Sequence, residues 1–541
     1  MGGGINGAGL FRELALQGVD CLLVDRADFA AGASSGSSRM IHGGLRYLEK
    51  REFRLVRESL RERNLLLANA AHYVAPLKTT VPLPSWFGGL LRSILIFLGF
   101  GVRPGHRGVL PLKLGLWYYD FVTRKNRRTP KHYFTSRAES LRSIPGLKPN
   151  IVGTATYWDA WITQAERLCI ELIQDACAAN PNCRALNYTQ PRAVEGGAIV
   201  LEDAVLGESL TVRPEVVANA TGAWVDKTNA RLGLETQFMG GTKGSHLVVD
   251  CPALHEALDG QVYYQHDDGR VCIVFPFLDR VIMGSTDIRV DDPDEACCDD
   301  DEVAYMLATL RGVFPGVAIS RKDIVYAYCG VRPLPSSAGV TANISRGHSL
   351  RVVEPQGDRA FPVYCLIGGK LTPFRAFAEM TADAILTRLG TARRCTTEDV
   401  PIGGGRDFPA DERQKAEWIA RVAGETGLAP SRVGVLLERY GTSARAYAAG
   451  ADAAAQRPLR SLPSYTVGEI TRIATEEYVE HLGDLLCRRS LIALLGQASE
   501  EVLSEIAQVL AGALGWDAAR TREEVDRALG EVRVPSRPAA P

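Results

Sequence analysis

In the first 25 residues, apolar positions first recur at helical spacing and then form a short continuous run, which predicts a helix followed by a strand. Apolar side chains recur at helical spacing between residues 6 and 17, at Leu10, Leu14 and Leu16. Residues 21–24 form a short apolar run that ends at Asp25, which is typical of a buried parallel strand. A glycine-rich loop precedes the helix, so the segment predicts a βαβ unit. Because only Met1 precedes the loop, we expect the first strand of that unit to be missing.

The middle of the chain has a different pattern. Residues 50–72 predict a helix rich in arginine and glutamate. From about residue 150 to residue 350, short apolar runs separated by turn residues predict an antiparallel sheet. Residues 363–367 predict another buried strand, which leads into two glycines and a helix over residues 373–389. Beyond about residue 400 the apolar spacing is helical, and the prediction there is a separate helical domain.

Two threonines in this last part predict helix starts. Thr466 and Thr521 each precede a glutamate by three residues, which is the spacing of a capping box. The fold class predicted for the whole chain is α/β, with a Rossmann-like dinucleotide-binding domain, an antiparallel-sheet substrate domain and a C-terminal all-helical domain. The expected boundaries are residues 1–80 with about 150–235 and 355–395 for the first, about 81–149 and 236–354 for the second, 400–534 for the third, and a disordered tail over 535–541.

Composition narrows the class of protein. The 541 residues are 46% hydrophobic and 23% charged, as is ordinary for an enzyme with a large buried core. A net charge of -1 gives no global attraction to nucleic acid, so no nucleic-acid partner is expected. The 12 cysteines and the histidines show neither disulfide nor metal-ligand spacing. We therefore expect no metal and a reducing, cytoplasmic compartment.

The glycine-rich loop matches the dinucleotide fingerprint G-x-G-x-x-G at Gly2, Gly4 and Gly7. These glycines let backbone N–H groups approach a pyrophosphate at the start of a helix. Asp25 lies 18 residues after Gly7, at the end of the next strand, where a carboxylate can bind a ribose hydroxyl. A plain glycine-rich turn is the alternative, but the helix, strand and acid that follow favour a dinucleotide site.

Two later segments favour FAD over NAD. Residues 216–224 form an apolar strand that ends in Ala-Thr-Gly, which adds Thr221 and Gly222 to the expected cofactor contacts. Residues 365–372 form a strand followed by Gly-Gly-Lys-Leu-Thr and a helix, so a second helix start can face the cofactor. The contacts expected there are Gly369, Lys370, Leu371 and Thr372. Long flavoproteins return to their cofactor late in the chain in this way, and we therefore predict FAD.

Six motifs, in order over residues 1–375, resemble those of the respiratory FAD-dependent glycerol-3-phosphate dehydrogenases. They are Gly2–Gly9, the segment 33–49 (A-S-S-G-S-S-R-M-I-H-G-G-L-R-Y-L-E), Lys243–His246, Gly284–Asp287, Gly330–Leu334 and Gly368–Thr372. Beyond residue 400 the resemblance rests mainly on position, length and the tripeptide at 440–442. Arg39 stands where the family has lysine and Ser285 where it has threonine, so charge and hydroxyl are kept.

The resemblance implies oxidation of sn-glycerol 3-phosphate to dihydroxyacetone phosphate, with electrons passing through FAD to a membrane quinone, ubiquinone or menaquinone. It also implies a peripheral position at the inner face of the cell membrane, and it leaves a homodimer open. Within the segment 33–49, the residues expected to bind FAD are Ser34, Ser35, Ser38, His42, Gly43, Gly44 and Leu45.

Oxidation of a phosphorylated secondary alcohol needs a base for the hydroxyl proton and cations for the phosphate. The resemblance implies that Arg332 and Arg346 bind the phosphate, a task that suits the planar guanidinium. Lys370 is expected to add positive charge, and His246 is the predicted base because neutral imidazole accepts a proton near pH 7. Without the surrounding motifs, the alternative interpretation would be favoured: the two arginines would form surface ion pairs, and the histidine would have a structural role. The remaining expected pocket residues are Tyr47 and Ser285.

Residues 86–100 are strongly apolar, yet too short and interrupted to cross a bilayer, which takes about 20 apolar residues. Aromatic residues at 117–119 and a basic run at 124–128 follow. Apolar anchors flanked by bases and aromatics suit a segment that enters an anionic membrane interface. The prediction is contact with a membrane surface through about residues 86–121, and the alternative is a buried hairpin with a solvated basic run.

Other functions stay open at this point. The same arginines would bind another polyol phosphate, such as erythritol 4-phosphate. An oxygen-using glycerophosphate oxidase would not need the apolar segment. An FAD-dependent amine or amino-acid oxidase could bind carboxylates through arginine, but the I-H-G-G-L-R-Y sequence favours the phosphate family. An inactive flavin-binding protein would have lost pocket residues, whereas His246, Arg332 and Lys370 are present.

Overall fold

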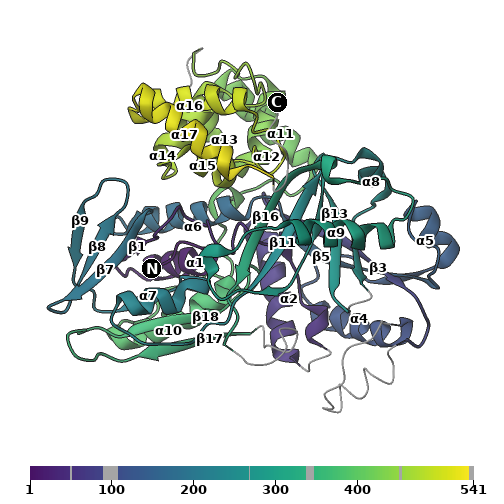
Figure 1. The fold of residues 1–541 in the computed structure, drawn as a ribbon, viewed down its shortest axis with the longest axis horizontal. Coiled ribbons are helices and arrows are strands. Elements are labelled where there is room, and N and C mark those ends of the chain that lie inside the picture. Colours follow the sequence, from purple (N-terminus) through teal and green to yellow (C-terminus); the bar gives the residue numbers. More distant parts are fainter. Residues whose placement is uncertain (49–51, 89–107, 267–268, 337–346, 450–453, 535–541) are drawn as a thin grey trace.

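The glycine-rich N-terminus lies within an α/β layer (Figure 1). The computed structural model describes residues 1–48, 52–88, 108–266, 269–336, 347–449 and 454–534. Helix α1 (Ile5–Leu16) packs against α6 (Ala165–Ala179) and α10 (Phe374–Leu389). The strands of this layer are β1 (Leu22–Val24) parallel to β6 (Arg184–Leu186), β10 (Val217–Asn219) parallel to β18 (Val363–Gly368), and β17 (His348–Val353) antiparallel to β18. A further antiparallel sheet contains β7 (Thr189–Glu195), β8 (Ala198–Asp203) and β9 (Ser209–Val212).

The backbone of Met1 links β1 to β10. Its amino group donates to the Ala218 carbonyl at 2.9 Å, and its own carbonyl accepts from the Ala220 N–H at 2.9 Å. The Gly2 N–H donates to the Val24 carbonyl at 2.8 Å. The first two residues thus lie between two strands that belong to separate sheets, and they lead directly into the glycine loop.

The second layer is a ten-stranded sheet within the described residues. Its order is β15-β11-β14-β13-β12-β3-β5-β2, with β16 also paired to β11 and β4 also paired to β5. Neighbours are antiparallel except β12 and β3, which run parallel. The strands are β2 (Met40–Ile41), β3 (Val74–Leu83), β4 (Tyr133–Ser136), β5 (Gly153–Ile162), β11 (Thr242–Val249), β12 (Gln261–Gln265), β13 (Val271–Phe277), β14 (Arg280–Gly284), β15 (Ile288–Arg289) and β16 (Ile324–Arg332).

The two faces of this sheet have different neighbours. Leu247 and Val249 of β11 are buried in a core shared with Leu307 and Leu310 of α9 (Asp300–Val313). Because side chains alternate along a strand, His246 points to the opposite face, toward the α/β layer. The apolar alternation of β11 therefore determines where this histidine lies.

The C-terminal helices form a domain-like body above α6 in Figure 1, with a hydrophobic core of their own. Thr466 caps α14 as predicted, accepting the Glu469 N–H. The prediction for Thr521 is wrong: α17 begins at Ala518 and is capped by Asp517, which accepts the Arg520 N–H, so Thr521 lies inside the helix. The helices are α11 (Glu412–Thr426), α12 (Pro430–Tyr440), α13 (Ala444–Ala448), α14 (Val467–Glu476), α15 (Leu482–Asp484), α16 (Glu500–Leu514) and α17 (Ala518–Glu531).

Helices α2 (Phe53–Asn69) and α4 (Val109–Thr123) pack against β5 of the large sheet. In the described part of the chain, no helix has both the length and the apolar character needed to cross a bilayer. The predicted fold class is confirmed: an α/β layer, a mainly antiparallel sheet and a helical C-terminal region are joined in one chain.

Candidate active site

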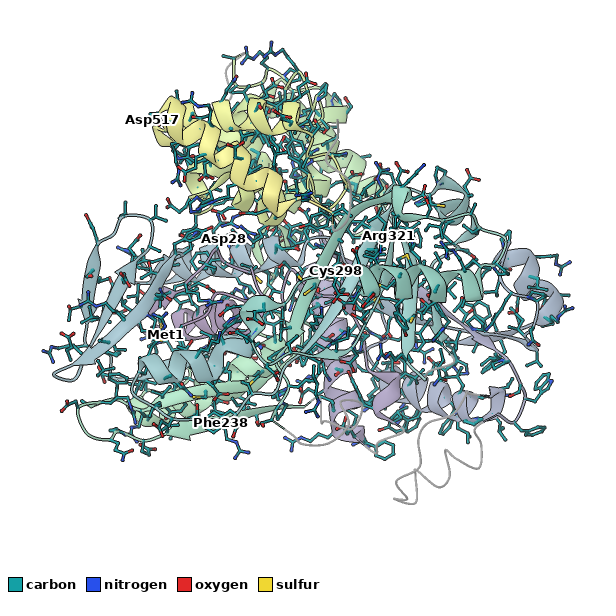
Figure 2. The ribbon with its side chains drawn as sticks, viewed as in Figure 1. Met1, Asp28, Phe238, Cys298, Arg321 and Asp517 are labelled. Carbon is teal, nitrogen blue, oxygen red and sulfur yellow. The ribbon has the colours of Figure 1, made fainter. Side chains whose placement is uncertain are left out.

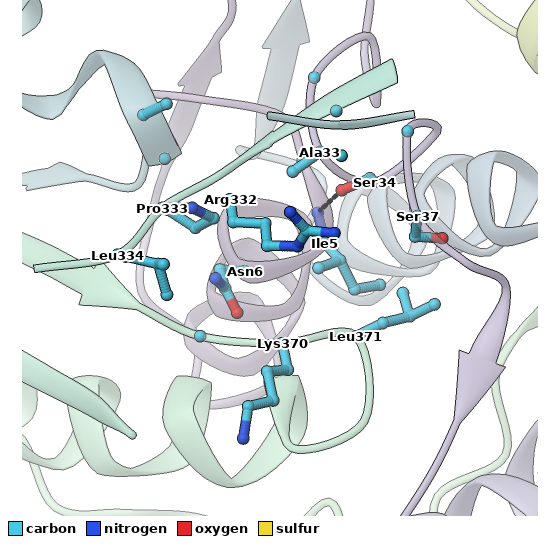
Figure 3. A pocket seen from close by; sticks show the side chains of 18 of the residues that line it. Ile5, Asn6, Ala33, Ser34, Ser37, Arg332, Pro333, Leu334, Lys370 and Leu371 are labelled. Carbon is cyan, nitrogen blue, oxygen red and sulfur yellow. Dashed lines mark hydrogen bonds between the residues drawn. The ribbon is translucent and has the colours of Figure 1, made fainter. Parts of the chain in front are cut away.

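A cavity of about 1460 Å³ lies between the α/β layer and the large sheet. The glycine loop, the segment after β1 and the turn after β10 line it from one side, and strands β5, β11, β12, β13 and β16 line it from the other. Figure 3 shows the side chains of Asn6, Arg332 and Lys370 around this cavity. The dinucleotide motif and the predicted substrate residues therefore share one site.

The glycine loop is shaped by close backbone contacts. Gly2 and Gly4 line the cavity, and Gly2 has a left-handed φ of +93°. Gly7 does not line it; a Cβ at Gly7 would lie 1.7 Å from the Gly2 carbonyl oxygen, so this glycine lets α1 begin directly behind the loop. The Ile5 N–H donates to Ser34 Oγ at 2.9 Å. The start of α1 thus faces the cavity in the arrangement that favours a pyrophosphate.

Asp25 follows β1 and lines the same cavity. Its carboxylate accepts the Gly3 N–H at 2.6 Å and the Ala27 N–H at 3.0 Å. Burial raises the pKa of Asp25 to about 6, against the lowering effect of these two N–H groups. The carboxyl group lies beside the glycine loop, where the motif predicts a ribose contact.

Most of the predicted flavin contacts in the segment 33–49 line the cavity, namely Ser34, Ser38, His42, Gly44 and Leu45. Ser35 and Gly43 do not. Ser35 Oγ donates to the Gly32 carbonyl at 3.0 Å, and the Gly43 N–H donates to Asp159 Oδ1 at 3.0 Å. A Cβ at Gly43 would lie 2.2 Å from the hydroxyl of Tyr119. These two residues support the cavity wall from behind.

The turns after β10 and β18 complete the wall. The predicted contacts that line the cavity here are Thr221, Gly222, Gly369, Lys370, Leu371 and Thr372. The His42 N–H donates to Thr372 Oγ1 at 3.2 Å. Lys370 Nζ is buried and lies 3.9 Å from the centre of the Tyr47 ring, a cation–π contact. The turn after β18 thus contacts the segment 33–49 at two places, through Thr372 at His42 and through Lys370 at Tyr47.

Arg332, at the end of β16, is held in one orientation. Its Nη2 donates to Ser285 Oγ at 3.2 Å and to the Thr286 carbonyl at 3.0 Å. Its Nη1 donates to the Lys243 carbonyl at 3.1 Å and to Asp287 Oδ1 at 3.2 Å. Arg346 lies outside the described residues, so its role stays a prediction from the sequence. The other predicted substrate residues, His246, Lys370, Tyr47 and Ser285, all line the cavity with Arg332.

His246 is a buried, neutral imidazole. Its Nε2 lies 2.8 Å from Ser38 Oγ, and its ring stacks on Tyr328 with 5.0 Å between ring centres. Nδ1 has no hydrogen-bond partner among the described residues. Burial, and then the positive charges of Arg332 and Arg39, lower the pKa of His246 to about 3. The imidazole is therefore unprotonated throughout the neutral range and can accept a proton.

This pKa predicts a particular pH profile. A lowered pKa means that the free enzyme loses its unprotonated His246 only as the pH falls through about 3. The ratio of kcat/KM between the wild type and His246→Asn should therefore stay constant from about pH 5.5 to 8.5, since kcat/KM reports groups of the free enzyme. Titration of the substrate phosphate affects both proteins and cancels in the ratio. A ratio that falls toward acid with a midpoint near 6.5 would contradict this account.

Sequence reasoning missed a row of side chains on β12. Gln261, Tyr263 and Gln265 line the cavity, because residues two apart share a face of a strand. The side chain of Gln261 is buried, and its Oε1 has no partner among the described residues. The signal available in the sequence was the spacing of Gln261, Tyr263 and Gln265, which places three polar side chains on one face of a strand.

A second missed group joins the two layers beside Asp25. Asp294 Oδ1 accepts Trp224 Nε1 at 2.8 Å, and Asp294 Oδ2 accepts Lys227 Nζ at 2.6 Å. Arg26 also pairs with Asp294 and lies over the Trp224 ring. All four residues line the cavity. Asp294 lies 70 residues from Trp224 in the sequence, and no motif links the two.

The cavity fits a large, polar dinucleotide. Its wall includes the glycine loop, where added Cβ atoms would meet backbone, and the buried Oδ1 of Asn6, which has no partner among the described residues. The chain matches the family described as "FAD dependent oxidoreductase" over residues 1–384 and the family described as "C-terminal domain of alpha-glycerophosphate oxidase" over residues 395–521. Fold, site and match define an FAD-dependent oxidoreductase, so its cofactor is FAD.

Two named relatives identify the family within the FAD-dependent oxidoreductases. The chain is 33% identical to "Glycerol-3-phosphate dehydrogenase" of Synechocystis sp., covering 98% of this chain and 94% of that protein. It is 31% identical to "Aerobic glycerol-3-phosphate dehydrogenase" of Escherichia coli, covering 76% and 78%. The chain belongs to the family of FAD-dependent glycerol-3-phosphate dehydrogenases.

A solved structure has the same fold. The glycerol-3-phosphate dehydrogenase from Bacillus halodurans complexed with FAD aligns with a TM-score of 0.75 and 23% identity, covering 100% of this chain and 95% of that one. The alignment includes the C-terminal helices, so the arrangement of all three regions is common to both chains.

Proposed function

We propose that the protein oxidises the secondary hydroxyl of sn-glycerol 3-phosphate to give dihydroxyacetone phosphate. The observation that carries this proposal is the convergence of Arg332, Lys370 and a neutral His246 on the cavity that the glycine loop also lines. A phosphorylated alcohol needs cations for its phosphate and a proton acceptor for its hydroxyl, and these side chains supply both. The names of the Synechocystis and Escherichia coli relatives support the same substrate.

In this proposal the phosphate binds between Arg332 and Lys370. The contacts of Arg332 with Ser285 and Asp287 fix its guanidinium plane, so less rotational freedom is lost when it binds phosphate oxygens. Lys370 adds a second positive charge on the side of the turn after β18, where its Nζ lies over the ring of Tyr47. Arg346, predicted from the sequence, would be a third cation.

His246 takes the hydroxyl proton. Its low pKa makes the unliganded imidazole a weak proton acceptor. The dianionic phosphate offsets the positive charge of Arg332, which is one cause of that low pKa, so substrate binding raises the proton affinity of His246. The contact with Ser38 orients the ring while it accepts the proton.

FAD would be held by the glycine loop, Asp25 and the segments that contain Ser34, His42 and Thr221. When bound, it supplies the acceptor for the two electrons removed with the substrate's carbon-bound hydrogen.

We further propose that the electrons pass to a quinone at the inner face of the cell membrane. Helix α4 supports this, because its outer face exposes Leu110, Leu114, Trp117 and Phe121 at helical spacing. Leu112, Leu116 and Tyr119 bury the opposite face, so the helix is anchored while its apolar strip faces outward. The exposed bases Arg124, Lys125 and Arg128 follow immediately, which suits an anionic lipid surface. Residues 89–107 of the predicted membrane segment lie outside the described residues.

The double substitution Leu114→Glu with Trp117→Glu should reduce binding to vesicles that contain anionic phospholipid by about tenfold or more, because it places two negative charges in the strip. Co-sedimentation with the vesicles measures this. Leu206→Glu is the matched control, since Leu206 is 70% exposed, comparable to 64% for Leu114, but lies in the loop between β8 and β9. Equal vesicle binding by the two variants would contradict the proposal that α4 contacts the membrane.

A panel of substrates tests the reaction itself. Dye-linked reduction should be fastest with glycerol 3-phosphate, slower with erythritol 4-phosphate, measurable with glycerol only at high concentration, and undetectable with a D-amino acid. A ubiquinone analogue should replace the dye, and oxygen should replace it poorly. Preference for the tetritol phosphate would change the substrate, and efficient peroxide formation would make the protein an oxidase.

A further inference from the structure

The C-terminal helices contact the loop that follows β1 through a buried ion cluster. Asp28 lies where the helical body meets the α/β layer (Figure 2). Its Oδ2 and Oδ1 accept Arg489 Nη1 and Nη2, each at 2.7 Å, and Arg488 also pairs with it. The side chains of Asp28 and Arg489 are both 0% exposed. Burial alone would raise the pKa of Asp28, but Arg489 and Arg488 hold it below its usual value, so the carboxylate stays charged.

The cluster is organised from the C-terminal side. Arg489 Nε donates to the Glu477 carbonyl at 2.7 Å and Nη2 to the Tyr478 carbonyl at 3.2 Å. Arg488 is held by Asp484, its neighbour one turn earlier, at 2.7 Å. Contacts within the C-terminal region thus hold both guanidiniums in the positions from which they bind Asp28. A buried ion pair adds little net stability over an apolar contact, so its value lies in fixing one arrangement.

The residue after Asp28 carries this arrangement to the dinucleotide loop. Phe29 is fully buried, and its ring meets Tyr478 edge-on at 5.3 Å between ring centres. Its other side covers Gly3, where a Cβ would lie 2.2 Å from Phe29 Cδ1. The Ala30 N–H donates to the Gly3 carbonyl at 3.1 Å, and the Gly3 N–H donates to Asp25 at 2.6 Å. A displacement of Phe29 would therefore reach the glycine loop and the Asp25 carboxylate.

We propose that the C-terminal domain forms part of the FAD-binding apparatus, with Arg488 and Arg489 as positioning residues that hold Asp28 and Phe29 against the glycine loop. Neither arginine lines the cavity, so both act through Phe29 and Gly3. This role concerns retention of the cofactor and does not depend on which polyol phosphate is oxidised. It also gives the helical domain a task at the site, although that domain contributes no residue to the cavity wall among the described residues.

Asp28→Asn tests the proposal, with Glu469→Gln as the matched control. Glu469 of α14 accepts Arg439 Nη1 at 2.8 Å and the Tyr440 hydroxyl at 2.6 Å, and its side chain is 1% exposed. Each substitution removes one buried charge at nearly constant shape, but Glu469 binds residues of α12 and not the two arginines that hold Asp28. The full-length proteins are stripped of flavin, and FAD binding is followed through quenching of its fluorescence, without substrate.

Asp28→Asn should raise the Kd for FAD about tenfold, or roughly 1.4 kcal/mol, and speed FAD release accordingly. Glu469→Gln should change the Kd less than about twofold, although both substitutions lower the unfolding temperature of the flavin-free protein. Equal changes in Kd, or a wild-type Kd for Asp28→Asn, would overturn the proposal. If Asp28→Asn does not fold, Arg488→Gln decides, since Arg488 lies at the rim of the cluster with 14% exposure. It should weaken FAD binding by a smaller factor, and an unchanged Kd there would equally overturn the proposal.

Discussion

Replacing Arg332 with methionine should lower kcat/KM for glycerol 3-phosphate roughly a thousandfold, or about 4 kcal/mol. Methionine keeps much of the side-chain volume but removes the charged fork that binds phosphate oxygens. The contacts of Arg332 with Ser285, Thr286 and the Lys243 carbonyl mean that lysine cannot reproduce its orientation. Arg332→Lys should therefore recover only part of the loss. Steady-state dye reduction measures both variants.

Two controls separate phosphate binding from other effects of Arg332. The FAD content of Arg332→Met should equal that of the wild type, because the expected loss concerns the substrate. Any residual rate with unphosphorylated glycerol at high concentration should be nearly unchanged. A proportional loss with glycerol would mean that Arg332 acts on the alcohol or the fold and would contradict its role as phosphate ligand.

Gly7→Ala should weaken FAD binding about 10- to 100-fold, because overpacking costs about 1–3 kcal/mol and each 1.4 kcal/mol is a factor of ten. The Cβ would lie 1.7 Å from the Gly2 carbonyl oxygen and so would displace the loop that faces the cofactor. The purified protein should then contain little flavin, as measured by its visible absorbance relative to protein.

Gly424→Ala is the control for this change. Gly424 lies in α11, where a Cβ would meet nothing within 4 Å, so alanine should leave the flavin content unchanged and stabilise the helix slightly. Normal flavin content in Gly7→Ala would contradict the assignment of the glycine loop as the dinucleotide site.

Local patterns account for what the sequence predicts well. The glycine loop, the helix after it and Asp25 form one contiguous unit, so spacing alone places them in a dinucleotide site. His246 follows from the alternation of β11, which buries Leu247 and Val249 on the far face. The error at Thr521 has a local cause as well, since Asp517 was an equally suitable cap four residues earlier.

Contacts between distant segments could not be predicted in this way. Asp294 meets Trp224 and Lys227 across 70 and 67 residues of sequence, and Asp28 meets Arg489 across 461. Each is an ordinary charged or aromatic residue by composition, and a solvated surface position is the default for such side chains. Only the packing of the layers brings these residues together. For this reason neither the Asp294 group nor the ion cluster of Asp28, Arg488 and Arg489 has a signature in the sequence.

The central claim is that bound FAD accepts electrons from glycerol 3-phosphate in this cavity. Anaerobic mixing of the FAD-loaded protein with sn-glycerol 3-phosphate, followed by the flavin absorbance, tests it most directly. The account predicts rapid and complete loss of the oxidised flavin band with glycerol 3-phosphate, and no change over the same time with an equal concentration of glycerol. A protein that retains FAD but keeps its oxidised spectrum with every polyol phosphate offered would contradict the account.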